Sequence, residues 1–252
     1  ECRIFTLSRI LGFKETWSQL IAQKGYQLVD HTLIPLGNDE QDNSPENADD
    51  GIDAENIVVQ RHRTALTRYN LSAPMQLLER FGFLNQEKTV FDYGCGKGDD
   101  VRNLKANAIT ANGWDPHFAP LEEKIESDIV NLGFVINVIE NINERRQALS
   151  NAYQLATELL VVSAMIYNQN SFKGRQFEDG VLTSRHTFQK YFTQSELKEF
   201  IDHTLSADAI AVGVGIFFVF KDADAEQKFQ SGRQRSRSKL ISLVERQKAT
   251  KP

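Results

Sequence analysis

The chain has 252 residues, 40% of them hydrophobic and 25% charged, and its formal net charge at pH 7 is −5. It is long enough to bury a full core, and we expect one principal soluble domain with appendages. No run of about 18 apolar residues is present, which excludes a membrane-spanning helix. The first residues also lack the pattern of a secretory signal. We therefore expect a cytoplasmic protein that does not contact a membrane.

Cysteine and histidine usage argues against cross-links and metals. The only cysteines are Cys2 and Cys95, which we do not expect to pair in a reducing compartment. The few histidines and cysteines show no metal-ligand spacing, so we expect no zinc or other metal. The chain begins at Glu1 rather than Met, as expected for a piece of a longer protein.

Charge is distributed unevenly and marks segments outside the core. Residues 39–55 carry eight acids and no Lys or Arg, whereas residues 228–252 carry eight Lys or Arg and one Glu. An acidic segment without aromatic residues cannot bury enough apolar surface to order itself. The chain then divides into a small N-terminal module (1–37), an acidic flexible linker (38–56), a principal domain (57–222) and a basic C-terminal tail (223–252). That tail is either a solvated terminus or a phosphate contact.

Elements taken in chain order predict an α/β architecture. Residues 14–25 have the apolar spacing of a short helix, and residues 26–34 alternate like a strand. Residues 58–84 are predicted to be helical with an interruption near residues 70–74. Further on, Thr193 and Glu196 form the capping box of a helix. The remaining elements are strands at 89–92, 110–115, 129–132 and 159–164, helices at 99–106, 144–157 and 194–202, and two closing strands within 209–222. Such alternation predicts a mainly parallel sheet.

A glycine-rich turn follows the first strand of this domain in the sequence VFDYGCGKGDD, residues 90–100. Its three glycines stand at every second position, unlike the G-x-G-x-x-G of dinucleotide-binding turns. Lys97 does not fit a P-loop, because glycine rather than Ser or Thr follows it. Asp99 and Asp100 would repel a phosphate where the helix dipole should attract one. We therefore expect no pyrophosphate ligand.

S-adenosylmethionine matches the remaining features of this turn. Its ammonium group needs a carboxylate, which Asp92 supplies, and its ribose needs an acid at the end of the second strand, where Asp115 stands. Glycines let the backbone turn beneath the ligand, and Trp114 offers a ring face to the adenine. The predicted cofactor-binding residues are Asp92, Tyr93, Gly94, Cys95, Gly96, Gly98, Trp114, Asp115 and Asn131.

Several separated blocks form a broader pattern: FDYGCGKGDD, GWDP, DIVNLGFVINVIEN and DGVLTSRHTFQKYFTQSEL, with HRTALTRYNLSAP ahead of the first strand. Together they resemble class I S-adenosylmethionine-dependent methyltransferases, and more narrowly the methyltransferases associated with bacterial DNA phosphorothioation. The resemblance covers about residues 60–222. It implies a Rossmann-like methyltransferase domain over residues 57–222, with S-adenosylmethionine as cofactor, encoded beside DNA-backbone modification genes.

One stretch departs from that family. Only twelve residues separate Asp115 from Asp128, enough for one crossover but too few for the helix and third strand that most class I methyltransferases insert. We therefore predict a Rossmann-like, mainly parallel sheet that is shortened after its second strand. The acid that usually contacts adenine has no clear counterpart, and Asp128 either replaces it or opens the next strand.

Candidate acceptor-site residues come from two segments. The strand predicted at 129–132 leads into NLGF, residues 131–134. Amino-methylating DNA enzymes carry Asp/Asn-Pro-Pro-Tyr/Phe at the corresponding strand end, so Asn131 and Phe134 are the predicted catalytic residues. The alternative is a plain strand-end loop. A long loop over residues 169–189 interleaves basic and aromatic side chains that suit phosphates and bases, unless it packs on the core as a lid. The predicted substrate-binding residues are Arg185, His186, Phe188, Lys190 and Tyr191. RHR at residues 61–63 either extends this basic rim or is a solvated helix face.

The sequence therefore predicts an S-adenosylmethionine-dependent methyltransferase. Nucleic acid, above all DNA, is the leading substrate, and other DNA-modification proteins are candidate partners. Two alternatives stay open. One is a non-catalytic accessory protein that holds the cofactor or DNA. The other is a small-molecule methyltransferase, because many such enzymes share the motif DYGCGKG.

Overall fold

The computed structural model describes residues 26–29, 32–35, 58–168 and 174–234. The chain splits into two compact units, Glu1–Ala54 and Glu55–Pro252. In the first unit, β1 (Tyr26–Val29) and β2 (Thr32–Pro35) pair as an antiparallel hairpin, so the strand-like stretch holds two strands. The helix predicted at 14–25 and the linker predicted at 38–56 lie outside the described residues.

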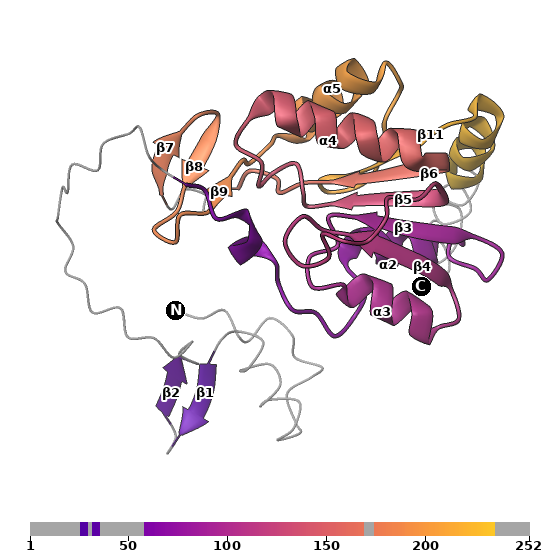
Figure 1. Ribbon diagram of the computed structural model, residues 1–252. Coiled ribbons are helices and arrows are strands. Elements are labelled where there is room, and N and C mark those ends of the chain that lie inside the picture. Colours follow the sequence, from indigo (N-terminus) through magenta and orange to yellow (C-terminus); the bar gives the residue numbers. More distant parts are fainter. Residues whose placement is uncertain (1–25, 30–31, 36–57, 169–173, 235–252) are drawn as a thin grey trace, which may run out of the picture. The chain divides into compact units, whose positions relative to one another are not determined.

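A six-stranded sheet forms the centre of the second unit, in the order β10-β11-β6-β5-β3-β4 (Figure 1). Neighbours among β4, β3, β5 and β6 are parallel, whereas β11 runs antiparallel to both β6 and β10. The predicted α/β class with a mainly parallel sheet is confirmed. The strands are β3 (Thr89–Tyr93), β4 (Thr110–Trp114), β5 (Ser127–Gly133), β6 (Ala156–Ser163), β10 (Ile210–Gly213) and β11 (Ile216–Phe220).

The sheet ends at β4, where the sequence predicted a shortened fold. Residues 115–126 form turns and irregular structure, with one isolated bridge between Asp115 and Ala119. The chain then passes directly to β5 on the far side of β3. The predicted shortening after the second strand is therefore confirmed, and β4 is an edge strand.

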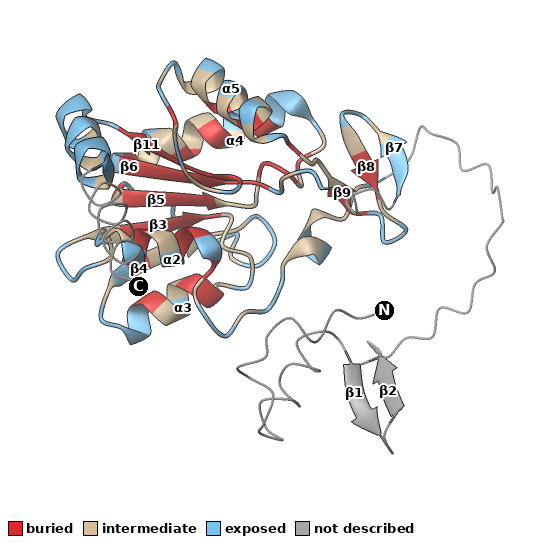
Figure 2. Cartoon of the chain, turned by 180° about the vertical axis from the view of Figure 1, so that it is seen from behind, coloured by how far each residue is buried: buried red, intermediate tan, exposed pale blue. Residues whose placement is uncertain are grey.

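Helices cover both faces of the sheet, and each face has its own apolar cluster. Leu149 of α4 and Ile201 of α5 pack in one cluster, and Leu78 of α2 and Leu104 of α3 pack in the other. Figure 2 shows the buried strands of the sheet between these helices. The helices are α2 (Ala73–Arg80), α3 (Asp99–Ala106), α4 (Ile142–Leu155) and α5 (Gln194–Leu205).

Helix starts follow local capping, with one prediction confirmed and one wrong. The capping box of Thr193 and Glu196 begins α5 as predicted. Helix α4 begins at Ile142 rather than residue 144, because the Asn141 side chain accepts hydrogen bonds from two backbone amides of its first turn. It also ends earlier than predicted, since Ala156 already belongs to β6.

The long helical prediction over residues 58–84 is largely wrong. Only the single turn η3 (Arg61–Thr64) and α2 are helical within it. The residues between them run without regular structure, and the backbone amides of Arg68 and Ser72 bond to side chains of α3. Residues 58–72 form an irregular segment that we name the strap.

The stretch predicted as a long irregular loop contains a small sheet. Strands β7 (Arg175–Phe177), β8 (Gly180–Leu182) and β9 (Phe188–Gln189) pair antiparallel, and residues 169–173 lie outside the described residues. Arg145 of α4 is 1% exposed and donates to both carboxylate oxygens of Asp179, at 2.7 and 2.9 Å. This bidentate pair fixes the small sheet to the domain.

The first part of the predicted basic tail belongs to the folded domain. Residues 223–234 are helical. Phe229 of this helix lies 5.2 Å from the ring of Phe81 and 5.6 Å from that of Phe218, between ring centroids. The apolar cluster beneath α2 therefore extends past residue 222, and residues 235–252 lie outside the described residues.

Candidate active site

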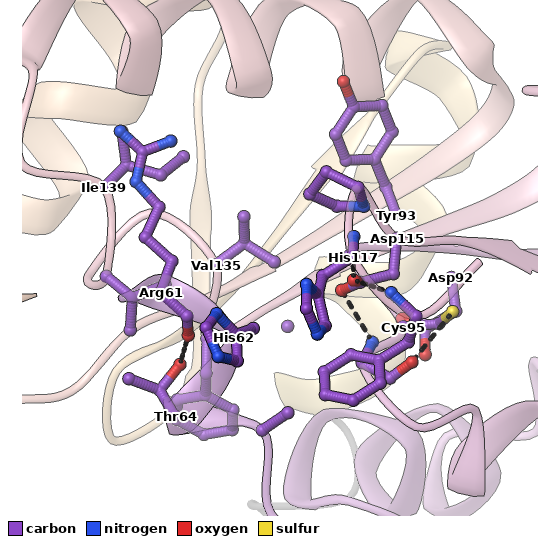
Figure 3. A pocket seen from close by; sticks show the side chains of 18 of the residues that line it. Arg61, His62, Thr64, Asp92, Tyr93, Cys95, Asp115, His117, Val135 and Ile139 are labelled. Carbon is purple, nitrogen blue, oxygen red and sulfur yellow. Dashed lines mark hydrogen bonds between the residues drawn. The ribbon is translucent and has the colours of Figure 1, made fainter. Parts of the chain in front are cut away.

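A cavity of about 720 Å³ opens beside the carboxyl ends of β3, β4 and β5. Open α/β sheets bind ligands at this edge, and cavities of roughly 300–1,000 Å³ are typical for small molecules. Five segments supply the wall: the strap, the glycine-rich turn, the residues after β4, the residues after β5 and helix α4. Figure 3 shows side chains from several of these segments around the cavity.

The glycine-rich turn is shaped by backbone bonds to the neighbouring strand. The amides of Gly94 and Cys95 both donate to the carbonyl of Trp114, at 2.7 and 3.1 Å. Gly94 has a φ of 84°, and a Cβ atom there would overlap the Val135 side chain. Gly98 has a φ of 73° and caps α3. These positive φ angles and the Val135 contact explain why glycine stands at Gly94 and Gly98 of this turn.

Asp92 and Asn131 form a buried polar pair on the cavity wall. They face each other on β3 and β5 and are only 5% and 2% exposed. The Asn131 amide donates to Asp92 Oδ1 at 2.8 Å. Burial, reinforced by the nearby charge of Asp100, raises the pKa of Asp92 to about 7. The amide oxygen of Asn131 is buried and has no hydrogen-bond partner within the described part of the chain.

This pair offers the hydrogen-bond acceptors that an ammonium group needs. A buried carboxylate gains from a neighbouring cation, and the orphaned Asn131 oxygen gains from any N–H donor. The residues present therefore fit the amino end of S-adenosylmethionine. Asn131 was also predicted to be a catalytic amide. That role stays a prediction: the amide nitrogen donates to Asp92, whereas the amide oxygen that the role would use has no partner among the described residues.

Asp115 ties the glycine-rich turn to the loop after β4. One carboxylate oxygen accepts from the amide of Gly96 at 3.0 Å, and the other accepts from the amides of His117 and Phe118 at 2.8 and 2.9 Å. A carboxylate has about four lone-pair sites, so capacity remains for a hydroxyl donor such as that of a ribose. Asp115 therefore organises two loops as well as facing the cavity.

Trp114 and Cys95, both predicted to bind the cofactor, line the cavity. The Nζ atom of Lys124 lies 3.6 Å from the Trp114 ring centroid, so a cation covers one face of that ring. Burial, with the charges of Asp92 and Asp115, raises the pKa of the Cys95 thiol to about 12. That thiol is protonated at neutral pH and is not a nucleophile there.

The two acids at the start of α3 hold the strap over the cavity. Asp99 accepts from the backbone amide of Arg68 and Asp100 from that of Ser72, both at 2.7 Å. Both acids are buried. From the sequence, these acids were expected only to repel phosphate. In the structure they also position the strap, which no local pattern indicates.

A second contact joins the strap to α4. The Arg61 guanidinium donates to Glu140 at 2.8 and 2.9 Å and to Glu144 at 2.7 Å. These bonds lower the pKa of Glu144 and raise that of Arg61. The prediction of a basic rim at residues 61–63 is therefore corrected at Arg61, whose charge is neutralised. Arg63 remains beside the small sheet, where it donates to the carbonyl of Arg185 at 3.3 Å.

Two histidines that sequence reasoning did not single out meet at the cavity. The rings of His62 on the strap and His117 after β4 stack with centroids 4.1 Å apart and planes inclined by 17°. Figure 3 shows these rings side by side, and both residues line the cavity. No sequence signal joins them, because they stand on segments that only the fold brings together.

Phe134, one of the predicted catalytic residues, does line the cavity. It has a φ of 59°, and its amide donates to the carbonyl of Ser163 at 2.9 Å. A left-handed conformation is unusual for a bulky residue and is found more often at functional sites. Its position at the end of β5 agrees with the prediction from NLGF.

The predicted substrate-binding residues lie outside the cavity lining. Phe188 is fully buried, and Lys190 is 13% exposed and pairs with Glu196 at 2.6 Å and Asp179 at 3.6 Å. Both side chains therefore pack around the small sheet, and their contact with a substrate stays a prediction. Arg185 and His186 are exposed, and Tyr191 is half-buried.

Asp128, which the sequence offered as a candidate for adenine recognition, lies at the amino end of β5, whereas the cavity lies at the carboxyl ends of the strands. It begins β5 and accepts from the amide and hydroxyl of Thr89, each at 2.8 Å. Its carboxylate therefore fixes the amino ends of β3 and β5. Within the described ranges, no three His, Cys, Asp or Glu side chains group as a metal site. No helix in those ranges is long and apolar enough to cross a membrane.

No protein-family model and no curated protein matches the chain. Solved structures are similar to it at low identity. One is a magnesium protoporphyrin IX methyltransferase from Synechocystis PCC 6803 with bound SAH, at 12% identity over 64% of this chain and 93% of that chain, with a TM-score of 0.42. A SAM-dependent methyltransferase from Aquifex aeolicus matches at 16% identity over 64% and 95%, with a TM-score of 0.42. Values this low assign no activity.

Replacing Asp92 by Asn tests the burial of its charge. The raised pKa means that the protonated carboxyl suits the fold: stability is present in full below the ordinary pKa of 3.8 and is lost as the pH rises from there through about 7. We therefore expect Asp92→Asn to raise the melting temperature by several degrees at pH 8 and by clearly less at pH 5. Asp115→Asn is the control and should lower it at both pH values. Equal shifts at both pH values for Asp92→Asn would contradict the assignment.

Proposed function

We propose that the protein is an S-adenosylmethionine-dependent methyltransferase. The observation that carries this proposal is the buried Asp92–Asn131 pair, whose orphaned oxygen and raised carboxyl pKa call for a cationic donor at the cavity wall. When bound, the cofactor supplies a methyl group from its sulfonium, whose C–S bond breaks with the electron pair left on sulfur. A lone pair of the acceptor forms the new bond.

The chain's own residues would act by positioning. Asp92 and Asn131 would hold the ammonium group, and Asp115 would accept from a ribose hydroxyl while it keeps the glycine-rich turn in place. Gly94 keeps the turn free of a Cβ that the neighbouring Val135 excludes. In-line methyl transfer depends mainly on such positioning.

We propose nucleic acid, with DNA first, as the acceptor class, in a cytoplasmic system linked to phosphorothioation and its DNA-modification proteins. This rests on the resemblance of the separated sequence blocks and on Arg63 of the strap and Arg185 between β8 and β9, which adjoin each other. Neither forms an ion pair with a carboxylate among the residues that the structure describes. A phosphate backbone would be attracted to such a pair.

A small-molecule acceptor is the second candidate. It is favoured by Arg61, whose charge Glu140 and Glu144 neutralise, so that this part of the wall offers a polyanion less positive charge. A non-catalytic accessory protein would bind the cofactor through the same residues and transfer no methyl group. Transfer and binding experiments separate these three cases.

Calorimetry with S-adenosylhomocysteine tests the cofactor site. We expect the wild-type chain to bind it, and Asp92→Asn to weaken binding about tenfold or more, because a charge-assisted hydrogen bond is worth roughly 1.5–3 kcal/mol. Asp208→Asn, which changes an exposed carboxylate outside the cavity, should bind like the wild type. No binding by the wild-type chain would overturn the proposal.

Labelled S-adenosylmethionine tests the acceptor class. With DNA from cells with and without phosphorothioate modification, we expect label in DNA, and binding that weakens log-linearly with salt. Arg185→Ala should flatten that salt dependence, whereas Gln176→Ala on the same small sheet should not. Label only in small molecules from the cell extract would replace DNA by the second candidate, and cofactor binding without any label would favour the accessory protein.

A further inference from the structure

The stacked histidines lie at the part of the cavity that the cofactor residues do not use. Asp92 and Asn131 occupy its floor on the sheet, whereas His62 and His117 are exposed residues of the strap and of the loop after β4. At about 720 Å³, the cavity has room for a second molecule beside a cofactor. The two rings therefore mark where an acceptor would enter.

His117 is held from several sides. Its amide donates to Asp115 at 2.8 Å, and the edge of its ring meets Phe118 at 4.8 Å and 82°. His62 lies in η3, whose first residue, Arg61, is fixed to Glu140 and Glu144. Both imidazoles are thus presented by anchored backbone, and they are not on freely extending surface loops.

The surroundings of the pair suit a flat, partly apolar molecule. Phe118, Leu66 and Val58 line the same cavity and are 39%, 65% and 75% exposed. Large apolar side chains left in contact with water beside a cavity mark a binding surface. Imidazole faces add a stacking surface, and a neutral imidazole nitrogen accepts a hydrogen bond.

Several other polar groups of the cavity wall are already committed. Arg61 occupies Glu140 and Glu144, and the strap amides occupy Asp99 and Asp100. Cys95 keeps its proton at neutral pH. Apart from Asp115 and Asn131, which the cofactor would use, the two imidazoles are exposed groups of the described lining that can accept from an entering N–H.

We infer that His62 and His117 form the acceptor subsite, and that its ligand is a planar heteroaromatic ring that stacks on an imidazole face and donates an N–H to an imidazole nitrogen. The inference rests on the proposed function and names the acceptor chemistry of the same cavity. The ring is either a free small molecule or a base of a nucleic-acid chain, whose phosphates would then lie toward Arg63 and Arg185.

Nuclear magnetic resonance of the histidine ring protons tests this on the full chain saturated with S-adenosylhomocysteine, so that the adenosine position is filled. The probes are adenine, a short single-stranded oligodeoxynucleotide, and piperazine as a saturated ring of similar polarity. Signals are assigned with His62→Phe and His117→Phe. We expect adenine to shift both signals and piperazine to shift neither, while the signal of His203 on α5 stays in place.

The variants separate stacking from loss of structure. His62→Phe and His117→Phe keep a ring and should retain adenine binding, weakened a few-fold by the lost nitrogen, whereas His62→Ala and His117→Ala should weaken it about tenfold, the scale of one lost stack. S-adenosylhomocysteine affinity should stay within about twofold in all four. His203→Phe is the matched control and should change neither affinity.

The outcomes are distinguishable. If S-adenosylhomocysteine binds but adenine and the oligodeoxynucleotide leave both signals in place, the acceptor subsite is wrong and the proposed function stands. If S-adenosylhomocysteine does not bind, the proposed function fails and the subsite fails with it. A shift by the oligodeoxynucleotide that weakens with salt assigns the ring to nucleic acid, and a shift by adenine alone assigns it to a small molecule; either outcome supports the subsite.

Discussion

One buried carboxylate sets the chemistry of this cavity. Asp92 ends a central strand, has little contact with water, and receives a single hydrogen bond, from Asn131, among the described residues. Its charge is therefore poorly stabilised, which is why its pKa rises to about 7. Burying an acid in this way costs stability at neutral pH, and a cationic ligand at the same place would offset that cost.

The neighbouring acids differ because each has backbone partners of its own. Asp99 and Asp100 accept from the strap, and Asp115 accepts from three amides of two loops. These three carboxylates fix the walls of the cavity. Asp92 accepts from no backbone amide among the described residues, so it can still accept hydrogen bonds from a ligand. The number of backbone donors that each acid meets thus decides whether it fixes the cavity wall or remains available to a ligand.

Local patterns in the sequence predicted the strands, the capping box and the glycine-rich turn, since each depends on residues close together in the chain. The shortened sheet was equally predictable, because twelve residues cannot hold a helix and a strand. Pairings between distant segments were not predictable. From the sequence, Arg61 could be part of a basic rim, but in the structure it pairs with Glu140 and Glu144. Lys190 was predicted to contact a substrate, and in the structure it pairs with Glu196. The histidine stack escaped notice for the same reason.

Titration of the Asp92 carboxyl carbon by ¹³C nuclear magnetic resonance tests the central claim most directly. In the free protein the carboxyl should titrate with a pKa near 7, and with saturating S-adenosylhomocysteine it should titrate well below 7, because the ligand's ammonium group stabilises the charged form. Asp92→Asn identifies the signal. A pKa in the ordinary range of an aspartate in the free protein, or one that ligand binding leaves unchanged, would contradict the account.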